Sequence, residues 1–588
     1  MAKFKTLPDL LNHVAASYRD QKAINEIQNG KWVNHSTEEV VNTIHQMAAG
    51  FQQMGLKKGE TVGLYAPSTS TWVMIDMAIL IAGGITVPIF ANISHSGLEY
   101  IIEDAKLKFI FVEGEQSIKE IQHLIHRFEK IILHDATHNE KNTCQFEEIL
   151  KVGKEAILKN PGIISDLQSK IIEEDVATYI YTSGSTGSPK GVELTHKNLV
   201  TQVTAAAEIF PVVVGKDCAL SCLPLPHIFE RMVMYFYFSQ GVSIFFADDV
   251  KNLAALLPQV KPTLLTVVPR LLEKVQAGMI TKSRSGSFFK RSIASMAFKK
   301  AMMKDPRSSK GVMDLIYDAL VYKKIRNALG GNLEYLISGG SALSKDLCRF
   351  YLNMGIPVYQ GYGMTECSPV ISSSYKGANE EGYVGKPFPG VTVKIADNGE
   401  ILVKGPGVMK CYHNKPEATA EVIDKDGWFH TGDKGELNER GLLKITGRIK
   451  EIFKTSNGKY VSPVKLEQLL IGYYLIDMAM IIGENYKFVS CILFLDPVNL
   501  RKLKEKLNKT QMSNEDFVKE EEVVGKIDAF IKEMNKSLDH WEQVQKFHIA
   551  SEVLSIEDGS LTPTMKIRRH VVLERYKDVI AKMYEEKL

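Results

Sequence analysis

The chain has 588 residues, too many for one hydrophobic core, so at least two domains are expected. Hydrophobic residues make up 45% and charged residues 24% of the sequence, as in ordinary globular proteins. The net charge of +3 gives no indication of a nucleic-acid partner. The seven cysteines are scattered, with no CxxC pair and no zinc-site spacing, which predicts reduced thiols in a cytoplasmic protein.

The N-terminal residues run directly into a polar helical pattern, without the apolar region of a secretory signal. The most apolar stretch, residues 72–90, is interrupted by Asp76, Gly83, Gly84 and Pro88. It is too short and too interrupted to span a bilayer, and a buried helix followed by a buried strand is predicted there. We therefore expect a cytoplasmic protein with peripheral membrane contact at most.

Short apolar runs alternate with helical patterns through the first three quarters of the chain. These runs are continuous and cover residues 61–65, 109–112, 131–133, 243–246, 264–268 and 335–338. Continuous apolar strands separated by helices predict α/β sheets that are covered on both faces. Later strand patterns alternate and are joined by Asn-Gly, Asp-Gly and Arg-Gly turns, which predicts antiparallel hairpins over residues 391–395, 400–403 and 442–445.

A glycine- and hydroxyl-rich string, residues 181–191, follows the apolar run 177–180 and reads Tyr-Thr-Ser-Gly-Ser-Thr-Gly-Ser-Pro-Lys-Gly. Glycines let backbone N–H groups turn toward an anion, and the hydroxyls and Lys190 add donors and a positive charge. This chemistry suits a polyphosphate. The string is not a Walker A loop, because Pro189 precedes the lysine and Gly191 follows it. A flexible connection can have the same composition, but this order of residues is more specific.

The string resembles the phosphate-binding loop of the adenylate-forming enzymes, the superfamily of acyl-CoA synthetases, nonribosomal adenylation domains and firefly luciferase. Further motifs similar to those of the family follow in its order at residues 361–366, 428–433, 447–463 and 563–566. The resemblance extends from about residue 10 to the end. It implies an α/β fold whose large N-terminal domain, residues 1–449, has two α/β subdomains and a β-barrel-like subdomain. Residues 450–588 would form a small mobile α+β domain.

The resemblance assigns most of the motif residues to ATP. The β- and γ-phosphates would be held by Thr182, Ser183, Gly184, Ser185, Thr186, Gly187 and Lys190. The adenine site would be formed by Gly339, Gly340, Ser341, Tyr362 and Gly363. The ribose hydroxyls would bind Asp433 and Arg448, and the α-phosphate would contact Thr365. Mg²⁺ would be bound by Glu366 with Thr182, since it takes oxygen ligands and bridges phosphates.

Four more residues receive roles from the same resemblance. Lys566 would reach between the acid's carboxylate and the α-phosphate, and His227 would border the acyl carboxylate. Lys450 would be the hinge, and Gly458 would approach the pantetheine arm of CoA. The alternatives are that Lys566 is a solvated lysine, that His227 is a structural histidine and that Asp433 is a turn former. The ordered set of motifs favours the functional interpretation.

The implied reaction has two steps: a carboxylate attacks the α-phosphate of ATP with loss of pyrophosphate, and the acyl group then passes to CoA. Residues 223–231, 278–326 and 451–463 are most similar to the long-chain fatty acyl-CoA synthetase branch. An acyl-AMP ligase or acyl–carrier-protein synthetase is the alternative. A non-catalytic relative is disfavoured by the presence of Glu366 and Lys566. The apolar residues 232–238 fit either an acyl tunnel or a core helix.

Segment 278–326 contains twelve lysines and arginines against three aspartates. Apolar residues recur among these charges at helical spacing: Phe288, Phe289, Ile293, Met296, Ala297 and Phe298. A basic amphipathic helix of this kind can lie on an anionic membrane. The alternative is a solvated insertion whose apolar side packs on its own domain, and the sequence leaves both interpretations open.

Overall fold

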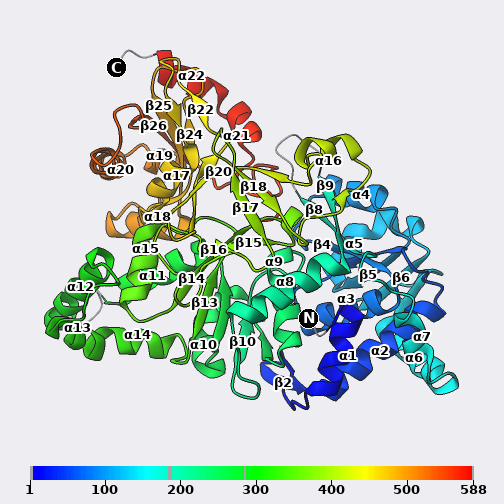
Figure 1. Ribbon diagram of the computed structural model, residues 1–588. Coiled ribbons are helices and arrows are strands. Elements are labelled where there is room, and N and C mark those ends of the chain that lie inside the picture. Colours follow the sequence, from blue (N-terminus) through cyan, green and yellow to red (C-terminus); the bar gives the residue numbers. More distant parts are fainter. Residues whose placement is uncertain (1–3, 183–188, 284–286, 450, 586–588) are drawn as a thin grey trace. The chain divides into compact units, whose positions relative to one another are not determined.

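The computed structural model describes residues 4–182, 189–283, 287–449 and 451–585 (Figure 1). By its internal contacts the chain divides into two units. Unit 1 comprises residues 1–394, 402–430 and 437–444, and unit 2 comprises residues 395–401, 431–436 and 445–588. Each unit has hydrophobic clusters of its own.

The first sheet of unit 1 has eight strands in the order β19-β9-β8-β4-β3-β5-β6-β7. The strands are β3 Thr61–Tyr65, β4 Ile85–Ile89, β5 Phe109–Glu113, β6 Lys130–His134, β7 Thr143–Gln145, β8 Val176–Thr182, β9 Lys190–Thr195 and β19 Cys411–Tyr412. From β8 to β7 all neighbours are parallel, whereas β9 and β19 are antiparallel. Strands β3, β4 and β5 are buried throughout, as their continuous apolar sequences require.

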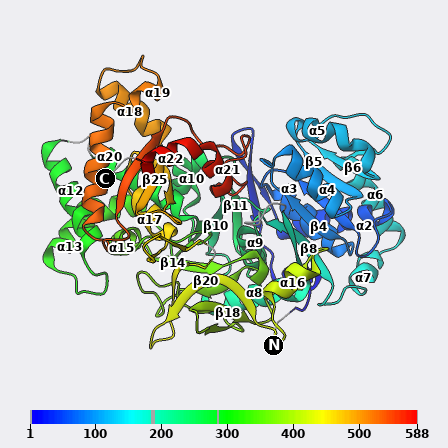
Figure 2. The ribbon, with the colours of Figure 1, turned by 90° about the horizontal axis from the view of Figure 1, so that it is seen from above.

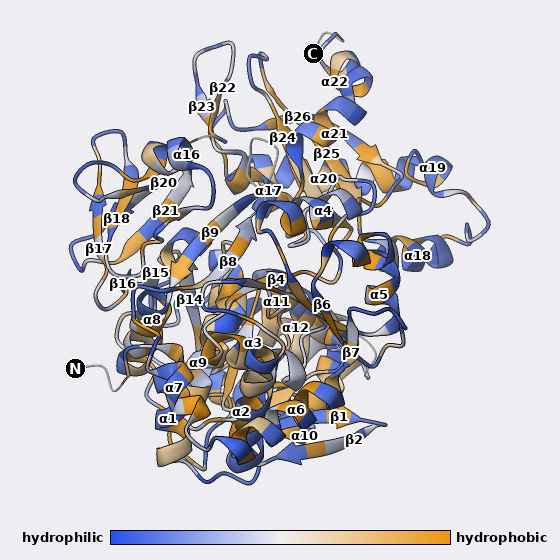
Figure 3. Ribbon diagram, turned by 90° about the vertical axis from the view of Figure 1, so that its right-hand side faces the viewer, coloured by the Kyte–Doolittle hydropathy of each residue, from blue (hydrophilic) through white to orange (hydrophobic). Residues whose placement is uncertain are grey.

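The helices of this region are α1 Leu7–Ser17, α2 Thr37–Gln53, α3 Ser70–Ile81, α4 His95–Asp104, α5 Glu115–Ile121, η1 Gln122–Arg127, α6 Phe146–Lys159 and α7 Ile163–Gln168. Figure 3 shows mixed hydrophilic and hydrophobic stretches along covering helices such as α2 and α6. The apolar stretch 72–90 is the buried α3 followed by the buried β4, as predicted. Among the described helices, none has the length and apolar character needed to cross a bilayer.

The second sheet of unit 1 has nine strands in the order β16-β15-β14-β13-β12-β10-β11-β1-β2. The strands are β1 Ile24–Gln28, β2 Lys31–His35, β10 Cys218–Ser221, β11 Ser243–Phe246, β12 Leu264–Val267, β13 Tyr335–Ser338, β14 Val358–Gly363, β15 Val370–Ser373 and β16 Lys386–Pro387. The six strands from β14 to β1 in this order are parallel. Their carboxyl ends therefore lie along one edge.

The helices that accompany the second sheet are α8 His196–Ile209, α9 Ile228–Ser239, η2 Val250–Asn252, α10 Leu253–Val260, α11 Pro269–Ser283, α12 Phe288–Met303, α13 Val312–Tyr317, η3 Asp318–Tyr322, α14 Lys323–Ala328, α15 Lys345–Asn353 and η4 Thr365–Cys367. Every residue of α9 is buried. Figures 1 and 2 both draw α9 between the strands of the two sheets. The run 232–238 is thus part of a core helix.

A four-stranded sheet in the order β17-β18-β20-β21 follows, with α16 Pro416–Val422. Its strands are β17 Thr392–Ile395, β18 Glu400–Lys404, β20 Phe429–Leu437 and β21 Leu443–Arg448. Burial alternates along β17, as predicted. In β18 the first four residues are all buried, so the predicted alternation is wrong there; β18 is an inner strand of this sheet.

The C-terminal part of unit 2, residues 451–585, contains a three-stranded sheet, β24-β25-β26, and a two-stranded sheet, β22-β23. Its elements are β22 Phe453–Lys454, β23 Tyr460–Val461, α17 Pro463–Ile471, β24 Ile476–Ile482, β25 Val489–Leu495, α18 Pro497–Lys506, α19 Asn514–Phe517, α20 Glu521–Asn535, β26 Val544–Ala550, α21 Arg569–Arg575 and α22 Lys577–Glu585. Alternate residues of β25 enter two separate hydrophobic clusters, so this sheet is covered on both faces.

Candidate active site

The β8–β9 hairpin carries the two ends of the predicted phosphate loop. Thr182 is the last residue of β8 and Lys190 is the first of β9, and the two residues pair in the antiparallel ladder. The Thr182 hydroxyl donates to the carbonyl oxygen of Lys190 at 3.5 Å. The loop residues Ser183, Gly184, Ser185, Thr186 and Gly187 lie outside the described residues. The described strands therefore place the two ends of the predicted loop side by side.

Lys190 and Glu366 are linked through Tyr412, a residue that the sequence did not indicate. The Lys190 ammonium lies 4.8 Å from the centre of the Tyr412 ring. The Tyr412 hydroxyl donates to Oε1 of Glu366 at 2.7 Å. Burial, together with the neighbouring Glu366, raises the pKa of Tyr412 well above its usual value, which keeps the hydroxyl a proton donor. Tyr412 lies in the two-residue strand β19, which carries no strand signal in the sequence.

The adenine-site residues lie at the carboxyl ends of β13 and β14. Gly339, Gly340 and Ser341 follow β13, and Tyr362 and Gly363 end β14. Because the two strands are parallel neighbours, both groups emerge at the same edge of the sheet. A Cβ on Gly363 would lie 1.9 Å from the carbonyl oxygen of a nearby proline, so only glycine fits there.

The catalytic candidates Thr365 and Glu366 follow directly in the short helix η4. The carbonyl oxygen of Glu366 accepts a hydrogen bond from the N–H of Met409 at 2.7 Å. This bond fixes η4 against the chain segment that leads to Tyr412. Glu366 is therefore held both by its backbone and by its side chain, which is the arrangement expected of a preorganised carboxylate ligand.

His227 caps the N-terminus of α9, where its Nδ1 accepts the N–H of Phe229 at 3.2 Å. The ring of Phe229 packs against the adenine-site loop, because a Cβ on Gly339 would lie 3.0 Å from it. The start of α9 and the glycine loop after β13 therefore touch. The structure brings the predicted acyl-carboxylate residue beside the predicted nucleotide residues.

In unit 2, Asp433 and Arg448 form an ion pair. The Nε of Arg448 donates to Oδ1 of Asp433 at 3.0 Å, and the Asp433 side chain is only 6% exposed. The Nη1 of Arg448 also lies 3.6 Å from Glu451. The two residues predicted to bind the ribose are therefore direct neighbours in the structure.

Lys566 and Gly458 lie in two separate tight turns of unit 2. The N–H of Lys566 donates to the Thr562 hydroxyl at 3.1 Å, and the Lys566 side chain is exposed. Gly458 lies between β22 and β23 with φ +80°, a conformation that favours glycine. The hinge candidate Lys450 lies outside the described residues.

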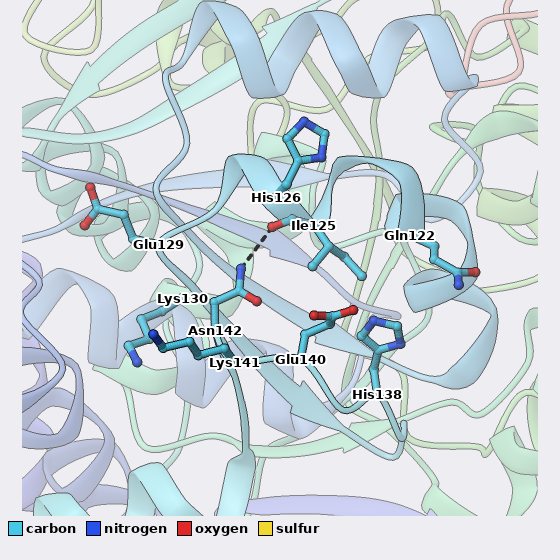
Figure 4. Close-up of a pocket in the computed structure, with 9 residues that line it drawn as sticks. All are labelled: Gln122, Ile125, His126, Glu129, Lys130, His138, Glu140, Lys141 and Asn142. Carbon is cyan, nitrogen blue, oxygen red and sulfur yellow. Dashed lines mark hydrogen bonds between the residues drawn. The ribbon is translucent and has the colours of Figure 1, made fainter.

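Two cavities of unit 1 contain none of the predicted residues. One, of about 570 Å³, is lined mostly by polar residues of η1 and of the loop between β6 and β7, and the Asn142 amide donates to the Ile125 carbonyl oxygen there (Figure 4). The second, of about 350 Å³, is lined in part by Glu113, His134 and Asp135, whose potential ligand atoms lie within 4.8 Å of one another. The polar lining of the first cavity does not suit an acyl chain.

Family models of known proteins match almost the whole chain. The model described as AMP-binding enzyme matches residues 11–413, and the model of the AMP-binding enzyme C-terminal domain matches residues 450–588. The chain belongs to the AMP-binding enzyme family. The resemblance seen in the motif order is therefore confirmed.

Several curated AMP-binding relatives match over nearly their full length. Long-chain-fatty-acid–CoA ligase FadD15 of Mycobacterium bovis is 32% identical over 95% of this chain and 93% of its own length. Long chain acyl-CoA synthetase 6 of Arabidopsis thaliana is 30% identical over 99% of this chain and 86% of its own length. Long-chain-fatty-acid–CoA ligase 6 of Homo sapiens is 29% identical over 94% of this chain and 82% of its own length.

Solved structures of other AMP-binding enzymes share the fold. The adenylation domain of a carboxylate reductase from Mycobacterium chelonae has a TM-score of 0.76 at 18% identity, and covers 99% of this chain and 91% of its own. A fatty acyl CoA synthetase of Mycobacterium tuberculosis has a TM-score of 0.62 at 20% identity, covering 98% and 100%. The predicted α/β fold class is confirmed.

Proposed function

We propose that this AMP-binding enzyme is a long-chain fatty acid–CoA ligase that forms AMP. A fatty acid attacks the α-phosphate of ATP to give acyl-adenylate and pyrophosphate, and CoA then takes the acyl group and releases AMP. The near-full-length similarity to long-chain ligases carries this proposal. The Lys190–Tyr412–Glu366 contacts beside the phosphate-loop hairpin support the use of ATP.

The residues present fit a magnesium ion bound with the phosphates. Glu366 and Thr182 offer carboxylate and hydroxyl oxygens, the donors that Mg²⁺ prefers. The hydroxyl of Tyr412 holds Oε1 of Glu366, which orients the carboxylate toward its ligand. A resident Mg²⁺ would neutralise charge on the phosphates. A magnesium–ATP complex is present in the solved structure of MenE from Bacillus subtilis, at 19% identity and TM-score 0.66.

Positioning and electrostatics supply the catalysis, because the substrate carboxylate is itself the nucleophile. Lys190, Thr182 and residues 183–187 hold the β- and γ-phosphates. Thr365 contacts the α-phosphate, and His227 directs the acid carboxylate at it. Lys566 bridges the carboxylate and the α-phosphate, so that the repulsion between these two anions is reduced.

The two half-reactions are served by two domains, residues 1–449 and 450–588. The C-terminal family model, which begins at residue 450, supports this boundary. We place the hinge at Lys450 because of the resemblance to the family. Lys566 acts in adenylation, whereas Gly458 lines the channel for the pantetheine arm of CoA in the second step. The positive φ of Gly458 supports a role that requires a bare backbone.

Pyrophosphate release tests the reaction. Fatty acids of short to long chain are supplied with Mg·ATP, with and without CoA. Multiple turnovers that require CoA and are fastest with long chains are expected, and Lys566→Ala should abolish them. A single burst of pyrophosphate that CoA does not extend would instead indicate a carrier-protein acceptor and would contradict the proposal.

Peripheral contact with an anionic membrane through residues 278–326 is part of the proposal. One apolar side of α12 packs on the domain, where Ala297 and Phe298 are buried and Phe298 contacts Phe350 of α15. A second apolar set is exposed: Phe288 (72%), Phe289 (77%), Met303 (68%), Val312 (75%) and Leu315 (62%). Lysines and arginines flank these side chains, which supports contact with a bilayer that carries negative charge.

Vesicle flotation tests this contact with neutral phosphatidylcholine vesicles and with vesicles that also contain phosphatidylglycerol. We expect binding to the anionic vesicles only, reduced by the double variant Phe288→Ser/Phe289→Ser. Val213→Ser/Val214→Ser is the matched control, because these adjacent residues are 55% and 56% exposed in unit 1 outside the segment. Equal binding to both kinds of vesicle, or an equal effect of the two variants, would contradict the contact.

A further inference from the structure

Helix α9 carries two consecutive charged residues in the middle of the protein. Glu230 and Arg231 are both 0% exposed. Successive residues of an α-helix point about 100° apart, so the two side chains reach different neighbours. Glu230 accepts hydrogen bonds from the hydroxyls of Ser221 at 2.6 Å and Thr266 at 2.7 Å, both in the nine-stranded sheet. Arg231 reaches the other sheet.

The guanidinium of Arg231 holds two elements at once. It donates to both carboxylate oxygens of Asp76 in α3, at 2.9 Å from Nε and 2.5 Å from Nη2. Its Nη1 donates to the hydroxyl of Thr178 in β8 at 2.7 Å. The Thr178 hydroxyl in turn donates to the carbonyl oxygen of Thr86 in β4 at 2.6 Å. Tyr235 completes the network with a hydrogen bond to Asp76.

Stability alone does not account for this ion pair. Burying two charges costs desolvation energy, and apolar residues of similar volume often give an equally stable or a more stable core. A guanidinium differs from an apolar side chain in having a rigid fork of donors with fixed directions. That fork fixes the rotation and the axial position of α9 relative to α3 and β8.

The position of α9 bears directly on the candidate site. His227 caps the helix one turn before Arg231, and β8 ends at Thr182, shortly after Thr178. The contact between Arg231 and Thr178 therefore joins the helix that presents His227 to the strand that leads into the phosphate loop. This link lies entirely within unit 1.

We propose that Arg231, held by Asp76, is a positioning residue for adenylation: its bond to Thr178 sets the place of His227 relative to Thr182. The inference rests on the proposed function, in which His227 directs the fatty-acid carboxylate and Thr182 helps to bind the phosphates. Misplacement of a reacting group by about 1 Å can lower a rate by about 100-fold. The network affects the rate of adenylate formation, while the affinity for ATP is unaffected.

Thr178 gives the most direct test, because Thr178→Val removes only the hydroxyl between Arg231 and β8. We expect this variant to lower the single-turnover rate of pyrophosphate release, with palmitate and Mg·ATP, at least 10-fold. The ATP concentration that gives the half-maximal rate should be unchanged. Thr178→Ser keeps the hydroxyl and should restore the rate. A Thr178→Val enzyme as fast as the wild type would overturn the inference. A wild type with no palmitate-dependent release would refute the proposed function, and the inference with it.

The double variant Asp76→Leu/Arg231→Met separates positioning from stability. Each single change leaves an unpaired buried charge and should lower Tm, whereas the double variant should recover most of that loss. Adenylation should stay slow in the double variant. Recovery of the rate together with Tm would show a merely structural pair and overturn the inference. Arg349→Met/Glu381→Leu, a partly buried bidentate pair away from α9, is the control and should leave the rate unchanged.

Discussion

Tyr412 shows how a single side chain can hold in place the carboxylate that we propose to bind Mg²⁺. Its hydroxyl donates to Oε1 of Glu366 while its ring lies beside the ammonium of Lys190. A hydrogen bond to a charged group contributes about 1.5–3 kcal/mol. Tyr412→Phe is therefore expected to slow pyrophosphate release about 10- to 100-fold and to raise the Mg²⁺ concentration needed for half-maximal rate.

A magnesium titration of pyrophosphate release checks this expectation. Tyr335→Phe is a suitable control, since it removes a hydroxyl that donates only to the backbone oxygen of Pro211. The control should titrate like the wild type. Identical titration curves for Tyr412→Phe and wild type would show that the hydroxyl does not orient Glu366.

Glu230 makes stability depend on pH. Burial raises the pKa of its carboxyl to about 7, against the opposing hydrogen bonds from Ser221 and Thr266. An unfolded glutamate has a pKa of about 4.3, so the folded state binds more protons between these values. The contribution of this carboxyl to the free energy of unfolding is fully present below about pH 4.3 and is lost as the pH rises through about 7. The buried Cys222 and Tyr237 also face this carboxyl.

Glu230→Gln removes the titration, while its amide oxygen can accept from one of the two hydroxyls and its amide N–H can donate to the other. We expect the Tm of the variant, relative to wild type, to be higher at pH 8 than at pH 5, with the change spread between about pH 4.3 and 7 and levelling off above that range. Differential scanning fluorimetry at a series of pH values measures this. A Tm difference that is constant over the series would mean that the pKa of Glu230 is the same in the folded and the unfolded protein.

At the scale of elements, the turn between β22 and β23 exposes bare backbone at Gly458. The left-handed conformation of this residue costs an L-amino acid about 1–2 kcal/mol. Gly458→Ala is expected to slow acyl transfer from preformed acyl-adenylate to CoA about 10-fold, because the methyl group would meet the approaching thiol arm. Adenylate formation should be unchanged.

Gly559→Ala provides the matched control. Gly559 also lies in unit 2 with a positive φ, +76°, and has no atom within 4 Å of where a Cβ would stand. Both variants carry similar backbone strain. If Gly458 lines the CoA channel, only Gly458→Ala should slow thioester formation. If the two substitutions slow acyl transfer equally, the strain and not the channel is responsible.

At the scale of the whole molecule, the proposed reaction needs two arrangements of two domains about Lys450. Proline fixes φ near −65° and thereby restricts the backbone. Lys450→Pro should therefore favour one arrangement, lowering one half-reaction at least 10-fold while sparing the other. Separate assays of adenylation and of acyl transfer measure this. Equal rates for both half-reactions in variant and wild type would argue against a hinge at this residue.

Local patterns in the sequence predicted the family, the fold class and six strands of the two large sheets, namely β3, β5, β6, β11, β12 and β13. Motif order and continuous apolar runs are local properties, so β3 and β11 were predicted at their observed bounds and α3 and β4 were predicted as a helix and a strand. The alternation expected for β18 was wrong because burial depends on the neighbouring strands.

Contacts between residues far apart in the sequence depend on the tertiary structure. Tyr412 reaches Glu366 because β19 pairs with β9, and Arg231 reaches Asp76 because α9 lies between two sheets. The tertiary structure also divided the apolar residues of 278–326 into a buried set and an exposed set. Hydropathy along a chain reports the tendency of each segment to be buried, whereas ion pairs and exposed patches depend on the order of strands and the packing of helices across the whole fold.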